Sequence, residues 1–315
     1  MGGEYAYRKL TRDKYLLLPY HSLYKAYRAN KYYLHVPDAV LPNESSEYSY
    51  PSRSNSLGFI GQEYPIAKKD SIGIRIISIG DSFTEGIGAP QDSSYPALLQ
   101  QMLNSDYPKP IEVINFGLSG SDPFYYYLLC RDIVLKYKPD ILLVTFNTSD
   151  IVDVNVRGGF ERFKADGTVQ YNKAPWFEPL YEHSVIFRSF LLNVLHCDFP
   201  PGTYKRTEAA PIQKLQIALD SIADLCAQYK MKLNIIFNPV ANEVSQHQLN
   251  LQPLLQYADS RNIETINLLP YFIQQGGNNV YQYFWKYDMH NNSKGYQLFA
   301  QGVYRNLKPQ LDSQP

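Results

Sequence analysis

Ser82 is the first residue of this sequence whose surroundings suggest chemistry. It closes Gly80-Asp81-Ser82, directly after the apolar run Ile74–Ile79, and Gly86 follows four residues later. Glycines on both sides allow a sharp turn that leaves the hydroxyl accessible, and a following helix would offer free N–H groups to an anion. The same tripeptide also suits a helix-capping serine. A phosphate loop is disfavoured, because no Lys-Ser/Thr ending follows. Ser82 is therefore a candidate nucleophile.

His290 is the candidate general base. It lies in Asp288-Met289-His290, after the last apolar run of the chain. A histidine at that place can take the serine proton and return it to the leaving group, and Asp288 can hold the imidazole in the required tautomer. The other histidines do not follow an apolar run in this way: His21, His35, His183, His196 and His247.

Two further loops could supply donors for an oxyanion. The first contains Gly117 and Gly120, and a glycine N–H can approach a ligand without obstruction; the second contains Asn147 and Ser149. Asn147 and Ser149 share a face if the strand geometry continues, and we favour Asn147 because its amide reaches further than a hydroxyl. The predicted oxyanion hole therefore combines the Ser82 N–H and a glycine N–H with the side chain of Asn147 or Ser149. Each loop alone would also suit an ordinary capped turn.

In their order and approximate spacing, the segments that contain Ser82, Gly120, Asn147 and His290 resemble the conserved segments of the SGNH (GDSL-like) hydrolase family, over about residues 74–305. The resemblance implies a flavodoxin-like sandwich and metal-free ester hydrolysis through an acyl-serine. It also implies a triad of Ser82, His290 and Asp288, with Gly120 as the oxyanion glycine. The stretch Asn55–Phe59 is similar to one in bacterial members that carry N-terminal extensions.

Two positions depart from the family pattern. Ser149 stands where the family usually has an asparagine that donates to the oxyanion. Many members also place the acid three residues before the histidine, where this chain has Tyr287, whereas Asp288 lies only two before it. The first departure leaves the third oxyanion donor open, and the loss of one donor typically costs about 2.7–4 kcal/mol in the barrier.

Alternating short apolar runs and amphipathic stretches must position these residues. The expected strands are Ile74–Ile79, Glu112–Phe116, Ile141–Phe146, Leu233–Asn238 and Thr265–Leu269. The expected helices are Ser94–Asn104, Pro123–Tyr137, Ile212–Tyr229, Ser245–Ser260 and Ser293–Leu307. Runs without period-2 polarity are typical of parallel strands covered on both faces. The pattern predicts an α/β fold, a three-layer α/β/α sandwich around a five-stranded parallel, flavodoxin-like sheet. Ligands of such sheets bind beyond the carboxyl ends of the strands.

Two segments interrupt the alternation. Residues 1–70 show no clear period and are expected to form an N-terminal extension packed on the core, with the hydrolase domain at 71–315. An insertion at about 151–210 is expected to contain a hairpin over 159–171, turning at Asp166-Gly167, and a helix over 185–195. It leaves a strand end, so a lid and plain scaffolding are both open.

The bulk composition narrows the function classes. Lys+Arg and Asp+Glu are both 30, so the net charge is zero, and nucleic acid is not an expected partner. The three cysteines are dispersed, and we expect no metal and no cofactor. No apolar run is long enough to span a membrane, and the first residues lack the layout of a signal peptide. Location stays open, with the cell envelope or secretion expected only if a leader or anchor has been removed.

The sequence therefore predicts a serine esterase that acts on a small-molecule or carbohydrate ester, with acetyl or other short acyl groups as the leading case. The 28 tyrosines agree with a sugar partner, since their rings offer flat area with a polar tip. An O-acyltransferase acting on a cell-envelope glycan would use the same residues. A non-catalytic carbohydrate-binding protein on this fold is the alternative from another class.

Overall fold

A five-stranded parallel sheet forms the centre of the molecule, in a computed structural model that describes residues 34–163, 209–276 and 279–313, with a few isolated positions between 180 and 194. Its strands are β3 (Ile74–Gly80), β4 (Ile111–Gly117), β5 (Ile141–Phe146), β6 (Lys232–Phe237) and β7 (Glu264–Asn267). Their spatial order is β4-β3-β5-β6-β7, all parallel. This is the flavodoxin-like order, in which the first strand of the sheet lies second from the edge.

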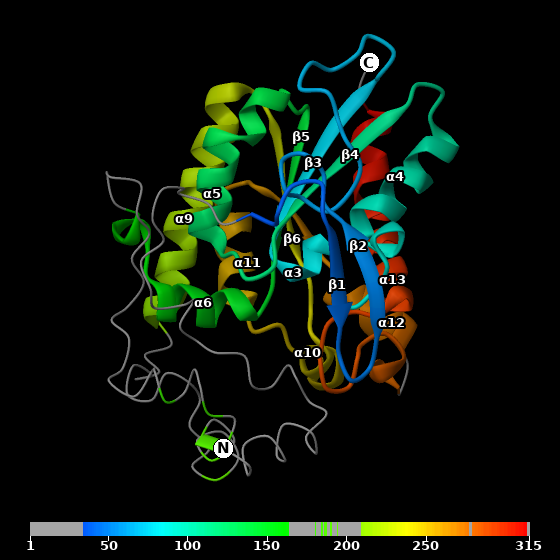
Figure 1. The fold of residues 1–315 in the computed structure, drawn as a ribbon. Helices are drawn as coiled ribbons and strands as arrows, with labels where there is room; N and C mark the ends of the chain where they lie inside the picture. Colours follow the sequence, from blue (N-terminus) through cyan, green and yellow to red (C-terminus); the bar gives the residue numbers. More distant parts are fainter. Residues whose placement is uncertain are drawn as a thin grey trace.

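Helices cover both faces of this sheet and complete three layers (Figure 1). One layer contains α4 (Tyr95–Asp106) and α13 (Ser293–Asp312), and the other contains α5 (Pro123–Asp132), α6 (Ser149–Arg157) and α9 (Ala209–Tyr229), with α11 (Gln252–Ser260) beside α9. The shorter elements are α3 (Ser82–Glu85), η1 (Gln91–Ser93), η2 (Val134–Tyr137), η3 (Phe160–Arg162), α10 (Ala241–Gln246), α12 (Leu269–Gly276) and η5 (Val280–Gln282). The predicted fold class is confirmed.

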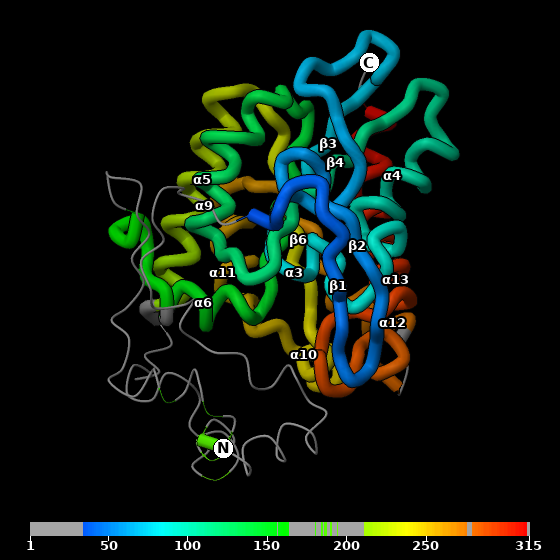
Figure 2. The backbone as a smooth tube through the Cα atoms, in the orientation of Figure 1, coloured from blue at the N-terminus to red at the C-terminus, as the bar shows by residue number. Residues whose placement is uncertain are grey.

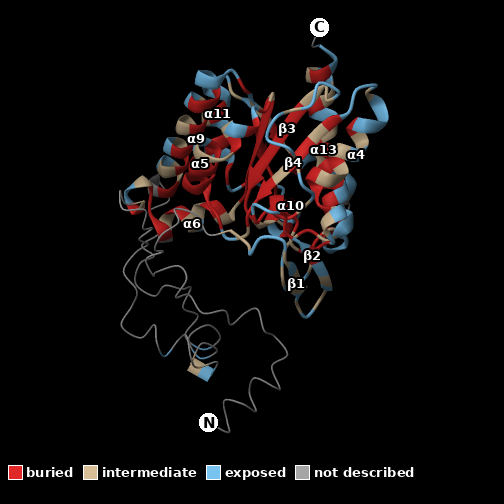
Figure 3. Ribbon diagram, turned by 45° about the horizontal axis from the view of Figure 1, so that its top comes forward, coloured by how far each residue is buried: buried red, intermediate tan, exposed pale blue. Residues whose placement is uncertain are grey.

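Burial on both faces of the sheet explains why its strands are continuously apolar. All six residues of β5 and the last six of β3 are buried (Figure 3). Because helices lie on both faces, side chains that point either way from these strands enter the core. No helix among the described residues is both long and apolar enough to cross a bilayer.

A β-hairpin lies ahead of the sheet domain, where the sequence showed no clear period. Strands β1 (Val40–Glu44) and β2 (Ser49–Arg53) pair antiparallel and form a separate two-stranded sheet. Prolines at 42 and 51 and the polar composition hide the strand signal, because proline lowers the apparent strand propensity. Figure 2 shows the hairpin in blue, with its tip beside the orange C-terminal segment.

Three predicted elements differ from the structure. The helix expected over Pro123–Tyr137 ends at Asp132, and the separate 3-10 turn η2 follows it. The helix expected over Ser245–Ser260 is two helices, α10 and α11, because His247 adopts a left-handed conformation at φ 55° and ends α10. Pro253 then starts α11, since proline fits the first turn of a helix. The hairpin expected from 159 begins instead with the η3 turn. Its Asp166-Gly167 turn, and most of the helix expected at 185–195, lie outside the described residues.

Candidate active site

Ser82 lies at the carboxyl end of β3, where it begins the single helical turn α3. The Asp81 side chain caps this turn, since its Oδ1 accepts a hydrogen bond from the Phe83 N–H at 3.0 Å. Gly86 ends the turn in the left-handed region at φ 103°, a conformation that glycine adopts without steric cost. The half-buried Ser82 side chain is therefore held at the edge of the sheet where ligands bind.

His290 and Asp288 lie next to Ser82, although more than 200 residues separate them in the sequence. His290 Nε2 is 2.7 Å from Ser82 Oγ, and His290 Nδ1 is 2.6 Å from Asp288 Oδ1. His290 is 22% exposed and Asp288 12%. Burial alone would raise the pKa of the Asp288 carboxyl, but hydrogen bonds to that carboxylate, chiefly from His290, hold its pKa below the usual value. The arrangement can transfer a proton from the serine hydroxyl to a histidine supported by a carboxylate.

Met289 explains how an acid only two residues before the histidine can reach the imidazole. Its φ is 70°, in the left-handed region, which is uncommon for a residue other than glycine. The turn is closed by hydrogen bonds from Trp285 N–H to the His290 carbonyl, at 2.9 Å, and from Met289 N–H to the Trp285 carbonyl, at 3.1 Å. The tight turn folds the Asp288 side chain back against its own histidine.

Backbone N–H groups near Ser82 could stabilise an oxyanion. Within the described part of the chain, neither the Ser82 N–H nor the Gly120 N–H has a protein acceptor. Gly120 is exposed, with a left-handed φ of 75°, and its carbonyl accepts a hydrogen bond from the Arg157 guanidinium. Arg157 thereby fixes the orientation of the turn that carries Gly120.

Asn147 and Ser149 take a different place from the one expected of a third donor. The Asn147 amide donates to Asp81 Oδ2 at 2.8 Å, and the Ser149 hydroxyl donates to the same oxygen at 3.0 Å. Asn147 is 1% exposed. Burial raises the pKa of the Asp81 carboxyl, and the bonds from Asn147, Phe83 and Ser149 oppose this rise. Both side chains therefore hold Asp81, the residue before Ser82.

A second group of residues surrounds the site and was not predicted from the sequence. Glu85, buried at the end of α3, accepts from the Ser119 N–H and lies 3.0 Å from His35 Nε2. The hydrogen bond to Glu85 raises the pKa of His35. From the β1–β2 hairpin, Glu47 and Tyr48 contact the loop that carries Asp288. Only the tertiary structure brings these residues to the site, since no periodicity links them to Ser82.

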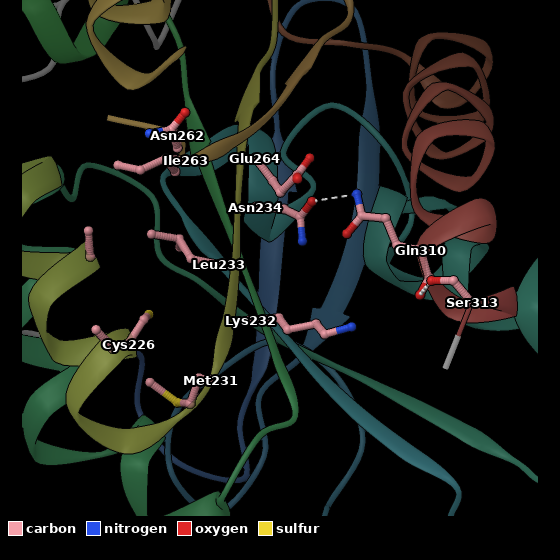
Figure 4. A pocket seen from close by; sticks show the side chains of 12 residues that line it. Cys226, Met231, Lys232, Leu233, Asn234, Asn262, Ile263, Glu264, Gln310 and Ser313 are labelled. Atoms are coloured by element: carbon pink, nitrogen blue, oxygen red, sulfur yellow. Dashed lines mark hydrogen bonds between the residues drawn. The ribbon is translucent and has the colours of Figure 1, made fainter. Parts of the chain in front are cut away.

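One hollow among the described residues lies away from this site. A cavity of about 500 Å³ opens at the amino ends of β6 and β7, the opposite edge of the sheet from Ser82 (Figure 4). Lys232, Asn234, Glu264 and Gln310 line it, and the Gln310 amide donates to Asn234 Oδ1 at 2.9 Å. Among the described residues, no three His, Cys, Asp or Glu side chains gather as metal ligands would.

Comparison with known proteins gives a family match over most of the chain. The profile of the GDSL-like lipase/acylhydrolase family matches residues 78–298. No curated protein matches the chain.

Solved structures give a likeness at low sequence identity. An α/β hydrolase enzyme from the metagenome of Lake Arreo, Spain, has a TM-score of 0.50 at 16% identity, covering 75% of this chain and 96% of that one. A mutant acetyl-xylooligosaccharide esterase from Geobacillus stearmophilus has a TM-score of 0.49 at 15% identity, covering 75% and 94%. A psychrotrophic esterase from Pseudoalteromonas sp. has a TM-score of 0.45 at 13% identity, covering 76% and 100%. At these identities the likeness is one of fold, and the first of the three carries it.

Proposed function

The chain belongs to the GDSL-like lipase/acylhydrolase family, and from this premise we propose that Ser82, His290 and Asp288 are its catalytic triad and that it removes short acyl groups from a carbohydrate. The family makes the chain an SGNH-type ester hydrolase. The observation that supports the triad best is the continuous hydrogen-bonded path from Ser82 Oγ through His290 to Asp288, with distances of 2.7 and 2.6 Å.

In the proposed reaction Ser82 Oγ attacks the ester carbonyl while His290 Nε2 takes the hydroxyl proton. The N–H groups of Ser82 and Gly120 stabilise the negative oxygen of the tetrahedral intermediate. The proton then passes from His290 to the leaving alcohol, and an acyl-serine remains. Water attacks this ester with His290 again as the base, which releases the carboxylic acid and restores Ser82. Asp288 stays ionised throughout and stabilises the imidazolium.

Aromatic side chains beside the triad support a carbohydrate as the part of the substrate that carries the acyl group. The ring centroids of Tyr48 and Tyr50 are 5.4 Å apart, and those of Tyr48 and Trp285 are 5.5 Å apart. All three rings are half-buried. Rings of this kind offer flat apolar area with a polar tip, which suits the alternating faces of a sugar.

Labelling with a fluorophosphonate probe tests the nucleophile. We expect the wild-type protein to carry one adduct, located by mass spectrometry on Ser82, and to hydrolyse aryl acetates and acetylated oligosaccharides. Ser82→Ala should abolish the adduct and lower kcat by several decades, as loss of a triad member does. Ser105→Ala, at an exposed serine of α4, is the matched control and should change neither result. A Ser82→Ala variant that retains more than about a tenth of the activity would exclude Ser82 as nucleophile.

The same assay separates the other two candidate functions. An O-acyltransferase would form the Ser82 adduct but pass the acyl group to a sugar hydroxyl faster than to water. A non-catalytic carbohydrate-binding protein would bind the oligosaccharide without labelling or turnover. The connected path between Ser82, His290 and Asp288 favours an enzyme over a binding protein.

A further inference from the structure

The tip of the β1–β2 hairpin contacts the loop that carries the proposed triad acid. This hairpin precedes residues 78–298, the range that the family profile matches. Its tip is the turn Ser45–Tyr48, in which the Ser45 hydroxyl oxygen accepts hydrogen bonds from the N–H groups of Glu47 and Tyr48. The Ser45 N–H donates to the Tyr48 carbonyl at 2.8 Å. The turn is therefore held in shape by hydrogen bonds of its own, in addition to its contacts with the loop.

Glu47 holds the backbone of that loop. Its Oε1 accepts from the Lys286 N–H at 2.8 Å, and its Oε2 accepts from the N–H groups of Tyr287, at 2.9 Å, and Asp288, at 2.8 Å. One carboxylate thus binds three consecutive N–H groups, an arrangement in which the negative charge strengthens every bond. The loop backbone is fixed immediately before the acid.

Tyr48 holds the acid itself. Its hydroxyl donates to Asp288 Oδ2 at 2.9 Å, while Asp288 Oδ1 faces His290 Nδ1 at 2.6 Å. Each oxygen of the Asp288 carboxylate therefore has its own hydrogen-bond partner. With both oxygens engaged, rotation of the carboxylate away from the imidazole would break a hydrogen bond to a charged group, one of the stronger kinds in a protein.

The short spacing between Asp288 and His290 goes with an uncommon backbone conformation at Met289, which the surrounding structure must stabilise. The left-handed φ of Met289 is a strained conformation for a residue other than glycine. A strained residue of this kind persists only where the surrounding structure determines its conformation. The hydrogen bonds of Glu47 and Tyr48 lie on the N-terminal side of Met289 and supply that restraint.

We propose that Tyr48 is a positioning residue of the triad and that Glu47 anchors the loop bearing the acid, so that the N-terminal hairpin is a working part of the active site. This inference rests on the proposed roles of Ser82, His290 and Asp288. It assigns a catalytic contribution to residues outside the family-matched range.

Tyr48→Phe is the primary test, because it keeps the ring and removes only the hydroxyl. We expect kcat for an aryl acetate to fall about tenfold, the effect of losing a hydrogen bond to a charged group. KM should change less than about twofold, since the substitution keeps the aromatic ring. A carboxylate that lacks one donor holds the imidazolium proton more strongly. The low-pH limb of the kcat/KM profile should therefore move to higher pH.

A double-mutant cycle separates positioning from general stability. In an Asp288→Asn background the charged acceptor is absent, so Tyr48→Phe should cost less than about twofold in kcat. Tyr257→Phe is the matched control: its hydroxyl donates to the Asp220 carboxylate at 2.7 Å in the outer helical layer, and its loss should leave kcat and the pH profile unchanged. Glu47→Gln should lower kcat several-fold, because the neutral amide binds the three N–H groups less strongly.

Two results would overturn the inference. One is a Tyr48→Phe enzyme with wild-type kcat and pH profile, and the other is an equal loss in both backgrounds of the cycle. Either can be told apart from failure of the proposed function, in which the wild-type protein itself would form no adduct on Ser82 and hydrolyse no ester.

Discussion

At the scale of single residues, Asp81 connects the turn that carries Ser82 to the loop after β5. Its Oδ1 caps α3, and its Oδ2 accepts from Asn147 and Ser149. The sequence predicts that one of these two side chains faces the oxyanion. Their bonds to Asp81 favour an indirect role, in which they fix the orientation of the residue that precedes Ser82.

Asn147→Ala tests this role. The substitution removes a donor from the buried Asp81 carboxylate, so the free energy of unfolding should fall by about 1–3 kcal/mol. Ser149→Ala should cost less, because that site is half-buried and water can replace the hydroxyl. Denaturant unfolding and kcat/KM measure the two effects. An Asn147→Ala variant with wild-type stability and kcat lowered about 10²–10³-fold would show that Asn147 is a direct oxyanion donor after all.

At the scale of elements, α6 begins with a buried acid. Asp150 is fully buried in the first turn of this helix, where its carboxyl accepts from the Asn147 N–H at 2.9 Å and from the Tyr126 hydroxyl at 3.0 Å. Burial, reinforced by the negative charge of Asp81, raises the pKa of Asp150 well above its usual value. The β5–α6 turn that positions Asn147 therefore contains an acid that resists ionisation.

The stability of this turn should depend on pH. An aspartate ionises near pH 3.9 in the unfolded chain, whereas Asp150 stays protonated to higher pH in the folded chain. Its contribution is thus fully present below about pH 4 and is lost as the pH rises through the folded pKa.

Asp150→Asn tests this dependence, because an amide does not titrate. Between pH 5 and 8 the Tm of the variant should fall less than that of the wild type, by about 2 °C or more. Asp92→Asn, at an exposed position of η1, is the control and should follow the wild-type curve. Parallel curves for Asp150→Asn and wild type would contradict the expected titration.

At the scale of the whole molecule, Phe59 joins the segment ahead of the sheet to the core of the sheet domain. Phe59 is completely buried, and its ring lies edge-on to that of Phe116 in β4, with centroids 4.4 Å apart. Asn55 shapes the loop before it by accepting from the N–H groups of Leu57 and Phe59. We therefore propose that the extension and the sheet domain unfold together.

Phe59→Ala should lower the free energy of unfolding by about 3–5 kcal/mol, the usual cost of removing a buried phenylalanine. Denaturation should remain a single transition when followed by circular dichroism and by fluorescence. Ile66→Ala is the control, since that side chain is 56% exposed and its loss should change stability by about 0.5 kcal/mol or less. Two separate transitions, or a small effect of Phe59→Ala, would mean that the extension folds independently.

The five strands of the sheet, and the residues that follow them at its edge, can be predicted from the sequence alone. Strands buried on both faces must be apolar throughout, so five of them could be recognised from their runs. Parallel strands also place their carboxyl ends together, so the sequence predicts that Ser82, Gly120 and His290 lie at one edge of the sheet. The helix over 245–260 was wrong, because the left-handed His247 interrupts a pattern that is otherwise continuous.

The hydrogen bonds that hold the site residues in place can be seen only in the tertiary structure. Tyr48 and Asp288 are 240 residues apart, and Asn147 and Asp81 are 66 apart. No periodicity encodes such pairs, because periodicity reports only which face of its own element a residue occupies. Hydrogen bonds between side chains form wherever the fold brings a donor to an acceptor. The role of the hairpin, the partner of Asn147 and the left-handed turn at Met289 therefore emerge only once the chain has packed.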